Sequence, residues 1–463
     1  AAPAHGSPER ATPRKIPRVA NAPIRVKIPV LLLLGALSAF AADRPNILLL
    51  FADDLGRYAS AYADPQQPSP NDIIETPVFD QVAEAGVRFD HAFVSAPSCT
   101  PSRGALYTGR HFFRNGSFSQ LHSRWQKGTP DPSEKIVGMP ATLGKAGYHI
   151  GWSHKWHIPA RLIGGKQNHY GKAGNRISTY SQQVTKKPDS KDEILEAVRE
   201  NFRSFLADRK AGQPFFYSFN PTNTHRTWVQ VSGKELWGLD PDKLKGKLPP
   251  FLPNNDIVRE DFADYLGEAM SFDAACGVIL DELKAIGEED NTLVVISGDH
   301  GIPGFPRGKC NVHDFGSRVL LEMRWPGKIK KERVIGTPVS LIDLAPTFLA
   351  AAGTESPDNP DGENLLPVLG GACEGNLRGW ALIGREVHVG SAREGFLPYP
   401  VRALRTADFL YVRNFKPDRW PMGDPKMADD ENPDFDQIDK NTRAAYADID
   451  ASPTKTWLIR NQD

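Results

Sequence analysis

Two pairs of potential metal ligands each follow directly on an apolar run of strand length. Asp53 and Asp54 come after the first run, and Asp299 and His300 come after another. Adjacent carboxylates at the end of a strand are costly unless they neutralise a charge, and the carboxyl edge of an α/β sheet is where binding sites form. Each pair alone would more often be a cap or a turn. A hard divalent cation with oxygen ligands would be their natural partner, with Ca²⁺ favoured, and the signature described below turns the odds toward one such metal site.

A cysteine stands at the expected beginning of a helix. The segment Cys99–Arg103 (CTPSR) precedes a helical pattern that continues to Thr108. Free backbone N–H groups and the helix dipole favour negative charge at such a position, and Pro101 lies early enough in the helix to be tolerated there. The position therefore suits a nucleophile that carries negative charge. The alternative is a buried thiol in a helix cap.

Four further cationic or imidazole side chains stand soon after expected strands. They are Lys155, His157, His225 and Lys309. Cations gathered in this way stabilise charge that develops on oxygen atoms during a reaction. A single lysine or histidine is more often just solvated, so the argument rests on the four together.

Alternating strands and helices are expected to position these residues. Strands are predicted over 45–52, 148–152, 214–220 and 292–297, and helices over 76–92, 102–108, 190–210, 261–286 and 339–352. This alternation predicts a layered α/β sheet. Short strand-like pieces such as 380–383 and 409–412 favour a smaller antiparallel sheet near the end of the chain. We expect a leader over 1–41, a catalytic domain over 42–370 and a C-terminal subdomain over 371–463, whose completeness stays open.

Composition and the N-terminus narrow the class of protein. The formal net charge is zero, so no global basic field attracts nucleic acid, and four cysteines are too few for a disulfide scaffold. Basic residues precede the apolar run Val30–Leu37, and Ala39-Phe40-Ala41 has the spacing of a signal-peptidase site. The run is too short for a comfortable membrane span. We expect export to the periplasm or the medium after cleavage near Ala41, with no stable membrane anchor.

The Cys99 segment resembles the signature of the type I sulfatases, C-x-P-S-R followed by x-x-L-x-T-G. The resemblance implies an alkaline-phosphatase-like mixed sheet and a cysteine that a formylglycine-generating enzyme oxidises to formylglycine. One hydroxyl of the hydrated aldehyde then attacks sulfur, and the other later expels sulfate. The family commonly has Asp-Asn where this chain has Asp299-His300, so His300 is a departure. Cys99, once modified, is also implied as a metal ligand.

The resemblance also assigns roles to the cations. Arg103 would hold the charge of the nucleophile, Lys155 would bind sulfate oxygens, and His157 would contact the formylglycine hydroxyl. His225 and Lys309 would face the sulfate and the bridging atom. His154 stands where the family usually has glycine.

Within the family the chain looks most like the sulfatases that act on N-sulfoglucosamine and their bacterial relatives. The supporting segments are Gly301–Pro303, His225-Arg226, Phe251–Asn254 and Tyr399–Arg402. The resemblance implies a sulfated glycan of the heparan type as substrate, and we expect Arg385, Glu386 and His388 to bind its sugar. The alternatives are an O-sulfatase for another sulfated glycan, a phosphoryl or phosphonate hydrolase, and a non-catalytic glycan-binding protein. The oligomeric state stays open.

Overall fold

A mixed sheet of seven strands forms the centre of the protein, in the order β4-β5-β1-β6-β8-β2-β9. The structure is a computed structural model that describes residues 44–120, 128–163, 169–171, 176–425 and 445–461. The expected leader lies outside these residues. The strands are β1 (Asn46–Ala52), β2 (Val87–Phe89), β4 (His149–His154), β5 (Phe215–Asn220), β6 (Thr292–Gly298), β8 (Leu321–Arg324) and β9 (Arg333–Ile335).

Four neighbouring strands of this sheet run in the same direction. β1 pairs in parallel with β5 and with β6, and β4 pairs in parallel with β5. Every residue of β1 is buried, because helices cover both faces of the sheet and an apolar run can then be buried on both sides. The carboxyl ends of the four strands consequently lie side by side at one edge.

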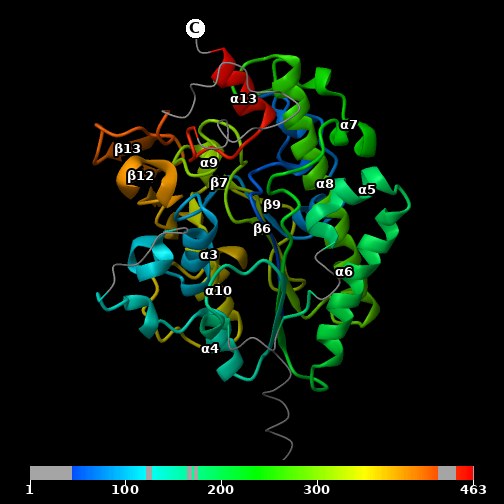
Figure 1. Cartoon of the computed structure of the whole chain (residues 1–463). Coiled ribbons are helices and arrows are strands. Elements are labelled where there is room, and N and C mark those ends of the chain that lie inside the picture. The colour runs from blue at the N-terminus through cyan, green and yellow to red at the C-terminus, as the bar shows by residue number, and fades with distance from the viewer. Residues whose placement is uncertain (1–43, 121–127, 164–168, 172–175, 426–444, 462–463) are drawn as a thin grey trace, which may run out of the picture. The chain divides into compact units, whose positions relative to one another are not determined.

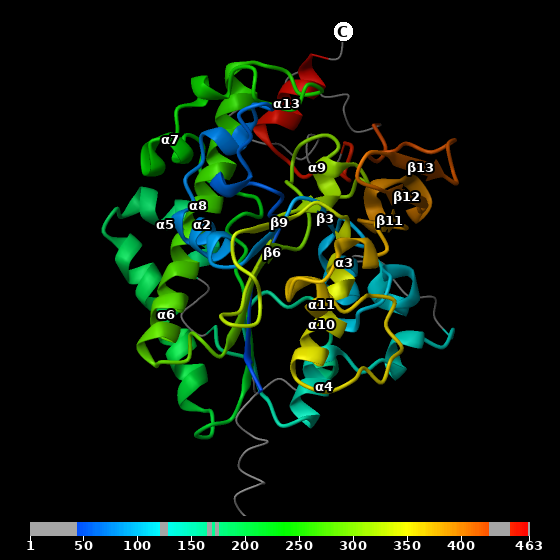
Figure 2. The same ribbon diagram turned by 180° about the vertical axis from the view of Figure 1, so that it is seen from behind.

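Two groups of helices cover the two faces of the sheet. On one face lie α5 (Tyr180–Lys186), α6 (Ser190–Ala207), α7 (Ser232–Trp237) and the long α8 (Asp256–Ala285), and Figure 2 shows α2 (Pro77–Glu84) beside α8. On the other face lie α3 (Cys99–Thr108), α4 (Met139–Lys145) and α10 (Leu344–Ala351), as Figure 1 shows. Each face has its own apolar core, one including Phe202 and Phe262 and the other including Leu106 and Phe348.

Two of the predicted helices are shorter than expected. The pattern over 76–92 predicted one helix, but α2 ends at Glu84 and the chain then forms β2. Gly86 lies so close to Met323 that a Cβ there would be 2.0 Å from the Met323 carbonyl oxygen, which places the chain against β8. The pattern over 339–352 likewise begins as the short strand β10 (Val339–Ser340), and the helix α10 begins only at Leu344. Strand pairing therefore overrides helical periodicity at both places.

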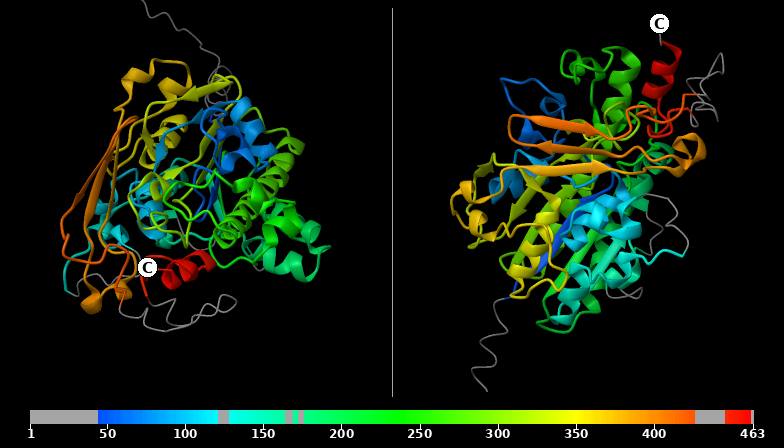
Figure 3. Two further views of the ribbon diagram at one scale, coloured as in Figure 1. Left: turned by 90° about the horizontal axis from the view of Figure 1, so that it is seen from above. Right: turned by 90° about the vertical axis from the view of Figure 1, so that its left-hand side faces the viewer.

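Two smaller sheets complete the fold. β3 (Ala92–Phe93) lies between β10 and β7 (Arg318–Val319), and β12 (Val401–Arg405) lies between β11 (Ala381–Arg385) and β13 (Leu410–Asn414). The second of these is antiparallel throughout, as predicted for the C-terminal part, and Figure 3 shows its three strands side by side. The last helix is α13 (Pro453–Arg460). Within the described part of the chain, no helix has the length and apolar character needed to cross a membrane.

Candidate active site

The register of β1 and β6 brings the two predicted ligand pairs together. Ala52 lies opposite Gly298, so the acids that follow both strands emerge at the same level of the sheet edge. Asp54 has φ 58°, a left-handed conformation, and its backbone N–H donates to Asp299 Oδ1 at 2.8 Å. Asp53, Asp54 and Asp299 are completely buried. Three carboxylates buried at one point require cations, and the surrounding side chains supply them.

Arg103 is the most deeply placed of these cations. Its side chain has no exposed surface, its Nε lies 2.8 Å from Asp299 Oδ2, and one terminal nitrogen lies 3.1 Å from Asp53 Oδ1. The other terminal nitrogen donates to Asn220 Oδ1 at 3.1 Å. Arg103 lies one helical turn after Cys99 in α3, and its guanidinium neutralises Asp299 and Asp53.

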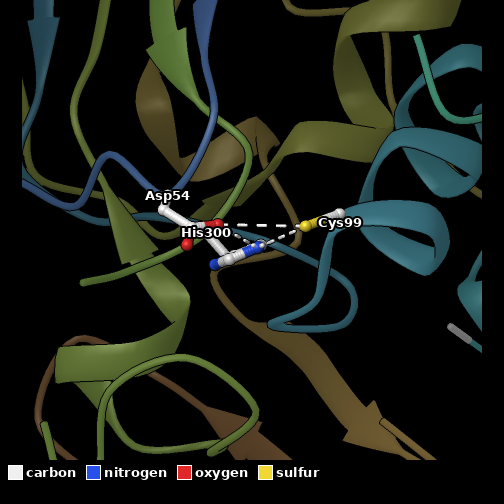
Figure 4. A group of neighbouring side chains, drawn as sticks. All are labelled: Asp54, Cys99 and His300. Carbon is white, nitrogen blue, oxygen red and sulfur yellow. Dashed lines mark hydrogen bonds and ion pairs between the residues drawn. The ribbon is translucent and has the colours of Figure 1, made fainter. Parts of the chain in front are cut away.

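Cys99 is the first residue of α3, which begins three residues before the predicted start at Ser102, and its side chain faces the acids. The Sγ atom lies 3.2 Å from Lys155 Nζ, 3.4 Å from His300 Nε2 and 3.8 Å from Asp54 Oδ1. Figure 4 shows Asp54 and His300 pointing toward the sulfur. Only 1 % of Cys99 is exposed. A group at this position is held at a helix N-terminus, between a lysine and the predicted metal ligands.

The donor atoms around Cys99 fit a divalent cation. Ligand atoms of Asp54, Cys99 and His300 lie within 4.8 Å of one another, and so do those of Asp53, Cys99 and Asp299. The carboxylate oxygens suit a hard cation such as Ca²⁺ or Mg²⁺, while an imidazole also suits transition metals. The structure therefore supports a metal site at the predicted residues.

Neighbouring charges lower the pKa of Asp53 and Asp54 and raise the pKa of His300. Burial raises the pKa of Asp53, but the charges of Lys155 and Arg103 outweigh it, so the pKa lies well below its ordinary value. The pKa of Asp54 is also lowered, because Lys309 and the two histidines outweigh burial. Burial lowers the pKa of His300, yet Asp299 and Asp54 raise it well above its ordinary value.

Two lysines flank the carboxylates from opposite sides. Lys155 follows β4 and its Nζ lies 2.6 Å from Asp53 Oδ2. Lys309 lies in the loop after β6 and its Nζ is 2.9 Å from Asp54 Oδ2. Both were predicted from their place after strands, and both reach the cluster. His157 lies just beyond Lys155, is exposed, and has φ 60°.

His225 joins the cluster through Lys309. Its Nε2 lies 3.1 Å from Lys309 Nζ, and its Nδ1 lies 2.6 Å from the carbonyl oxygen of Arg226. A carbonyl can only accept, so Nδ1 carries the proton and Nε2 accepts from the lysine. About a third of the side chain is exposed, at 33 %. His225 is therefore an oriented imidazole at the open side of the site.

The three residues expected to bind sugar have different environments. Arg385 and His388 are buried, with 4 % and 2 % exposure, and both face Asp448 at 3.5 Å and 3.6 Å. Glu386 is 30 % exposed and pairs with Arg402. The turn after β11 lines a small pocket together with Ser98, so Glu386 lies beside the beginning of α3. Of the three, Glu386 has the side chain accessible to a sugar.

The structure also adds residues that the sequence did not single out. Asn220, at the end of β5, accepts from Arg103 and from Tyr107. Asp450, in the segment before α13, places Oδ2 3.1 Å from Lys309 Nζ. The signal for Asn220 was available, because a polar residue ends the apolar run 214–220 in the same way as the acids end the others. No apolar strand directly precedes Asp450, so the sequence contains no comparable signal for it.

Known proteins share both the sequence pattern and the fold. A family model described as Sulfatase matches residues 45–354. An ulvan-active sulfatase from Formosa agariphila is 24% identical over 423 residues, covering 81% of this chain and 62% of its own length. An N-sulphoglucosamine sulphohydrolase from Homo sapiens is 27% identical over 423 residues, covering 85% of this chain and 77% of its own. This chain thus spans less than two thirds of the ulvan-active relative.

A solved structure confirms the architecture. The putative sulfatase yidJ from Bacteroides fragilis has a TM-score of 0.60 and 20% identity, and the match covers 80% of this chain and 86% of that one. At its carboxyl edge this α/β sheet carries a buried cluster of acids and cations around Cys99. The chain belongs to the sulfatase family, and so to the sulfuric ester hydrolases.

Proposed function

We propose that the protein hydrolyses the N-sulfate of a terminal glucosamine in heparan-type saccharides, using formylglycine made from Cys99 and one bound Ca²⁺. The observation that carries the reaction is the position of Cys99 Sγ, 3.2 Å from Lys155 and 3.4 Å from His300, inside the acidic cluster. The choice of N-sulfate rests on the 27% identical N-sulphoglucosamine sulphohydrolase and on the segments that resemble that subfamily.

The side chains of this protein divide the work of binding and charge stabilisation. Asp53, Asp54 and Asp299, with His300, would hold the cation, whose positive charge would stabilise the charge on a sulfate oxygen. Lys155, which is paired with Asp53, can donate to a sulfate oxygen, and the Lys309 ammonium, which is paired with Asp54, adds positive charge to the site. Donors fixed in a water-poor site stabilise developing charge without reorganising, and that effect is usually the largest contribution to catalysis.

His225 is placed to handle the leaving group. It is oriented by the Arg226 carbonyl and Lys309, and it is the partly exposed member of the cluster. The neutral imidazole accepts from Lys309 at Nε2, so the proton for the nitrogen that leaves when a sulfamate is hydrolysed would come from the Lys309 ammonium by way of His225. Glu386, at the rim of the small pocket beside α3, is the residue we expect to contact a sugar hydroxyl.

A sulfated saccharide panel tests the substrate. The mature protein, expressed with a formylglycine-generating enzyme in the periplasm or as a secreted protein, is given N-, 2-O- and 6-O-sulfated glucosamine saccharides, and released sulfate is measured. Cys99→Ala serves as the inactive control. Release from the N-sulfated sugar supports the proposal, while release only from O-sulfated sugars would replace it by O-sulfatase activity. The relation to an ulvan-active sulfatase makes that second function the alternative.

A further inference from the structure

The segment before the last helix returns to the active site and places a carboxylate there. Asp450 Oδ2 lies 3.1 Å from Lys309 Nζ, and 27 % of its side chain is exposed. The same ammonium group lies 2.9 Å from Asp54 and 3.1 Å from His225 Nε2. An ammonium group has three N–H donors. Lys309 uses two of them in hydrogen bonds to Asp54 and His225, and it forms an ion pair with Asp450.

The residues just before Asp450 in the chain are held in place by ion pairs. Asp448 is completely buried and lies 3.5 Å from Arg385, 3.6 Å from His388 and close to Arg393. Burial raises the pKa of Asp448, but Arg385, His388 and Arg393 outweigh it and hold the pKa far below the ordinary value. Arg385 and His388 thus fix the C-terminal segment against the end of β11.

The residues that follow Asp450 are also held in place, by hydrogen bonds. Ser452 Oγ donates to the carbonyl oxygen of Gly304 at 2.6 Å, and Thr454 Oγ1 donates to Asp261 at 2.6 Å. Asp261 also forms a two-bond ion pair with Arg226, at 2.7 Å and 2.9 Å, and Arg226 is the neighbour of His225. The segment consequently connects the loop of Lys309 with the loop of His225.

We propose that Asp450 is a positioning residue, which fixes the ammonium group of Lys309 and through it the imidazole of His225. Without the Asp450 carboxylate, Lys309 keeps one acidic partner, Asp54, and can turn toward it and away from His225. The two groups would then be poorly aligned with the reacting sulfate, although each is still present. Misplacement of a catalytic group by about 1 Å can cost on the order of a hundredfold in rate.

A double-mutant cycle with Asp450→Asn and Lys309→Ala tests this role. The inference rests on the proposed function, so the assay is hydrolysis of a small aryl sulfate by the mature enzyme. Asp450→Asn should lower kcat about tenfold and change KM little, with metal content and melting temperature unchanged. Asp450→Glu, which keeps the charge, should recover part of the loss. In the Lys309→Ala background, Asp450→Asn should have almost no further effect, since coupled residues are not additive.

Each other outcome overturns the inference or the function beneath it. An equal loss from Asp450→Asn in both backgrounds would mean that the residue does not act through Lys309. Failure of Asp450→Asn to fold, or a loss that Asp450→Glu does not recover, would assign the carboxylate to stability. An unchanged kcat in Asp450→Asn would remove the role altogether. Asp418→Asn, at an exposed acid of the same part of the chain, is the matched control. If the wild-type protein hydrolyses no sulfate at all, the proposed function fails and not this inference alone.

Discussion

Arg103 offers the sharpest test of how the carboxylate cluster is stabilised. Arg103→Met replaces the guanidinium by an apolar side chain of similar length and removes the ion pairs with Asp299 and Asp53, at 2.8 Å and 3.1 Å. Removing one partner of a fully buried pair costs about 3–5 kcal/mol of unfolding free energy. Asp53 keeps Lys155 at 2.6 Å, whereas Asp299 loses its nearest cation. We therefore expect a loss near the lower limit, about 3 kcal/mol.

A bound divalent cation should reduce this loss, because it neutralises the same oxygens. The assay is urea unfolding of wild-type and Arg103→Met protein, each in excess chelator and in excess calcium. Ligands that bind only the native state stabilise it by mass action, so calcium should recover part of the difference. Arg203→Met is the control, since 50% of the Arg203 side chain is exposed and it pairs with the exposed Glu196 and the mostly buried Glu282. The unfolding free energy of Arg203→Met should differ little from that of the wild-type protein. Equal losses at Arg103 and Arg203, or no response to calcium, would refute this account.

Three further outcomes follow from the same contacts. Mass spectrometry of active protein should show formylglycine at Cys99, and Cys99→Ala should abolish turnover with the fold intact; an active unmodified thiol would contradict the mechanism. Asp54→Asn should lower the bound metal below one ion per chain in elemental analysis, while Asp418→Asn should not; full metal occupancy in Asp54→Asn would remove Asp54 from the ligand set. Burial raises the pKa of Glu268 to about 7, against roughly 4.3 in an unfolded chain. Between these values the folded state binds more protons, so stability falls as pH rises, and Glu268→Gln should flatten that fall in urea unfolding at pH 5, 6 and 7. An unchanged slope would show that Glu268 does not titrate in this range.

The part of the site that could be predicted lies at the ends of parallel strands. Asp53, Asp54, Asp299 and Lys155 all follow apolar runs, and parallel pairing of β4, β5, β1 and β6 brings those ends to one edge. The period and burial of each strand are properties of a few consecutive residues. A sequence therefore contains enough information to place such residues together once the sheet is assumed.

Helix boundaries were harder to predict because long-range contacts decide them. The apolar spacing over 76–92 is helical throughout, yet the chain leaves the helix at Glu84 so that Val87–Phe89 can pair with β8 and β9. The partners of this strand lie far along the chain, and the local pattern contains no sign of them. The same holds at Val339–Ser340, where pairing with β3 replaces the first turn of the expected helix. Local propensity was outweighed at both places by strand pairing.

The contribution of the C-terminal segment depends on contacts that no local pattern encodes. Asp448 and Asp450 look like surface acids in a polar stretch, and Arg385 and His388 look like groups free to meet a substrate. In the structure, Asp448 pairs with the buried Arg385 and His388 after β11. Asp450 lies in the same segment and pairs with Lys309. Arg385 and His388, which we expected to bind a ligand, thus have an internal partner, and Asp450, which the sequence did not single out, reaches Lys309. These pairings form only when the segment after β11 packs against the segment before α13. Each buried charge is then compensated by the opposite charge of its partner.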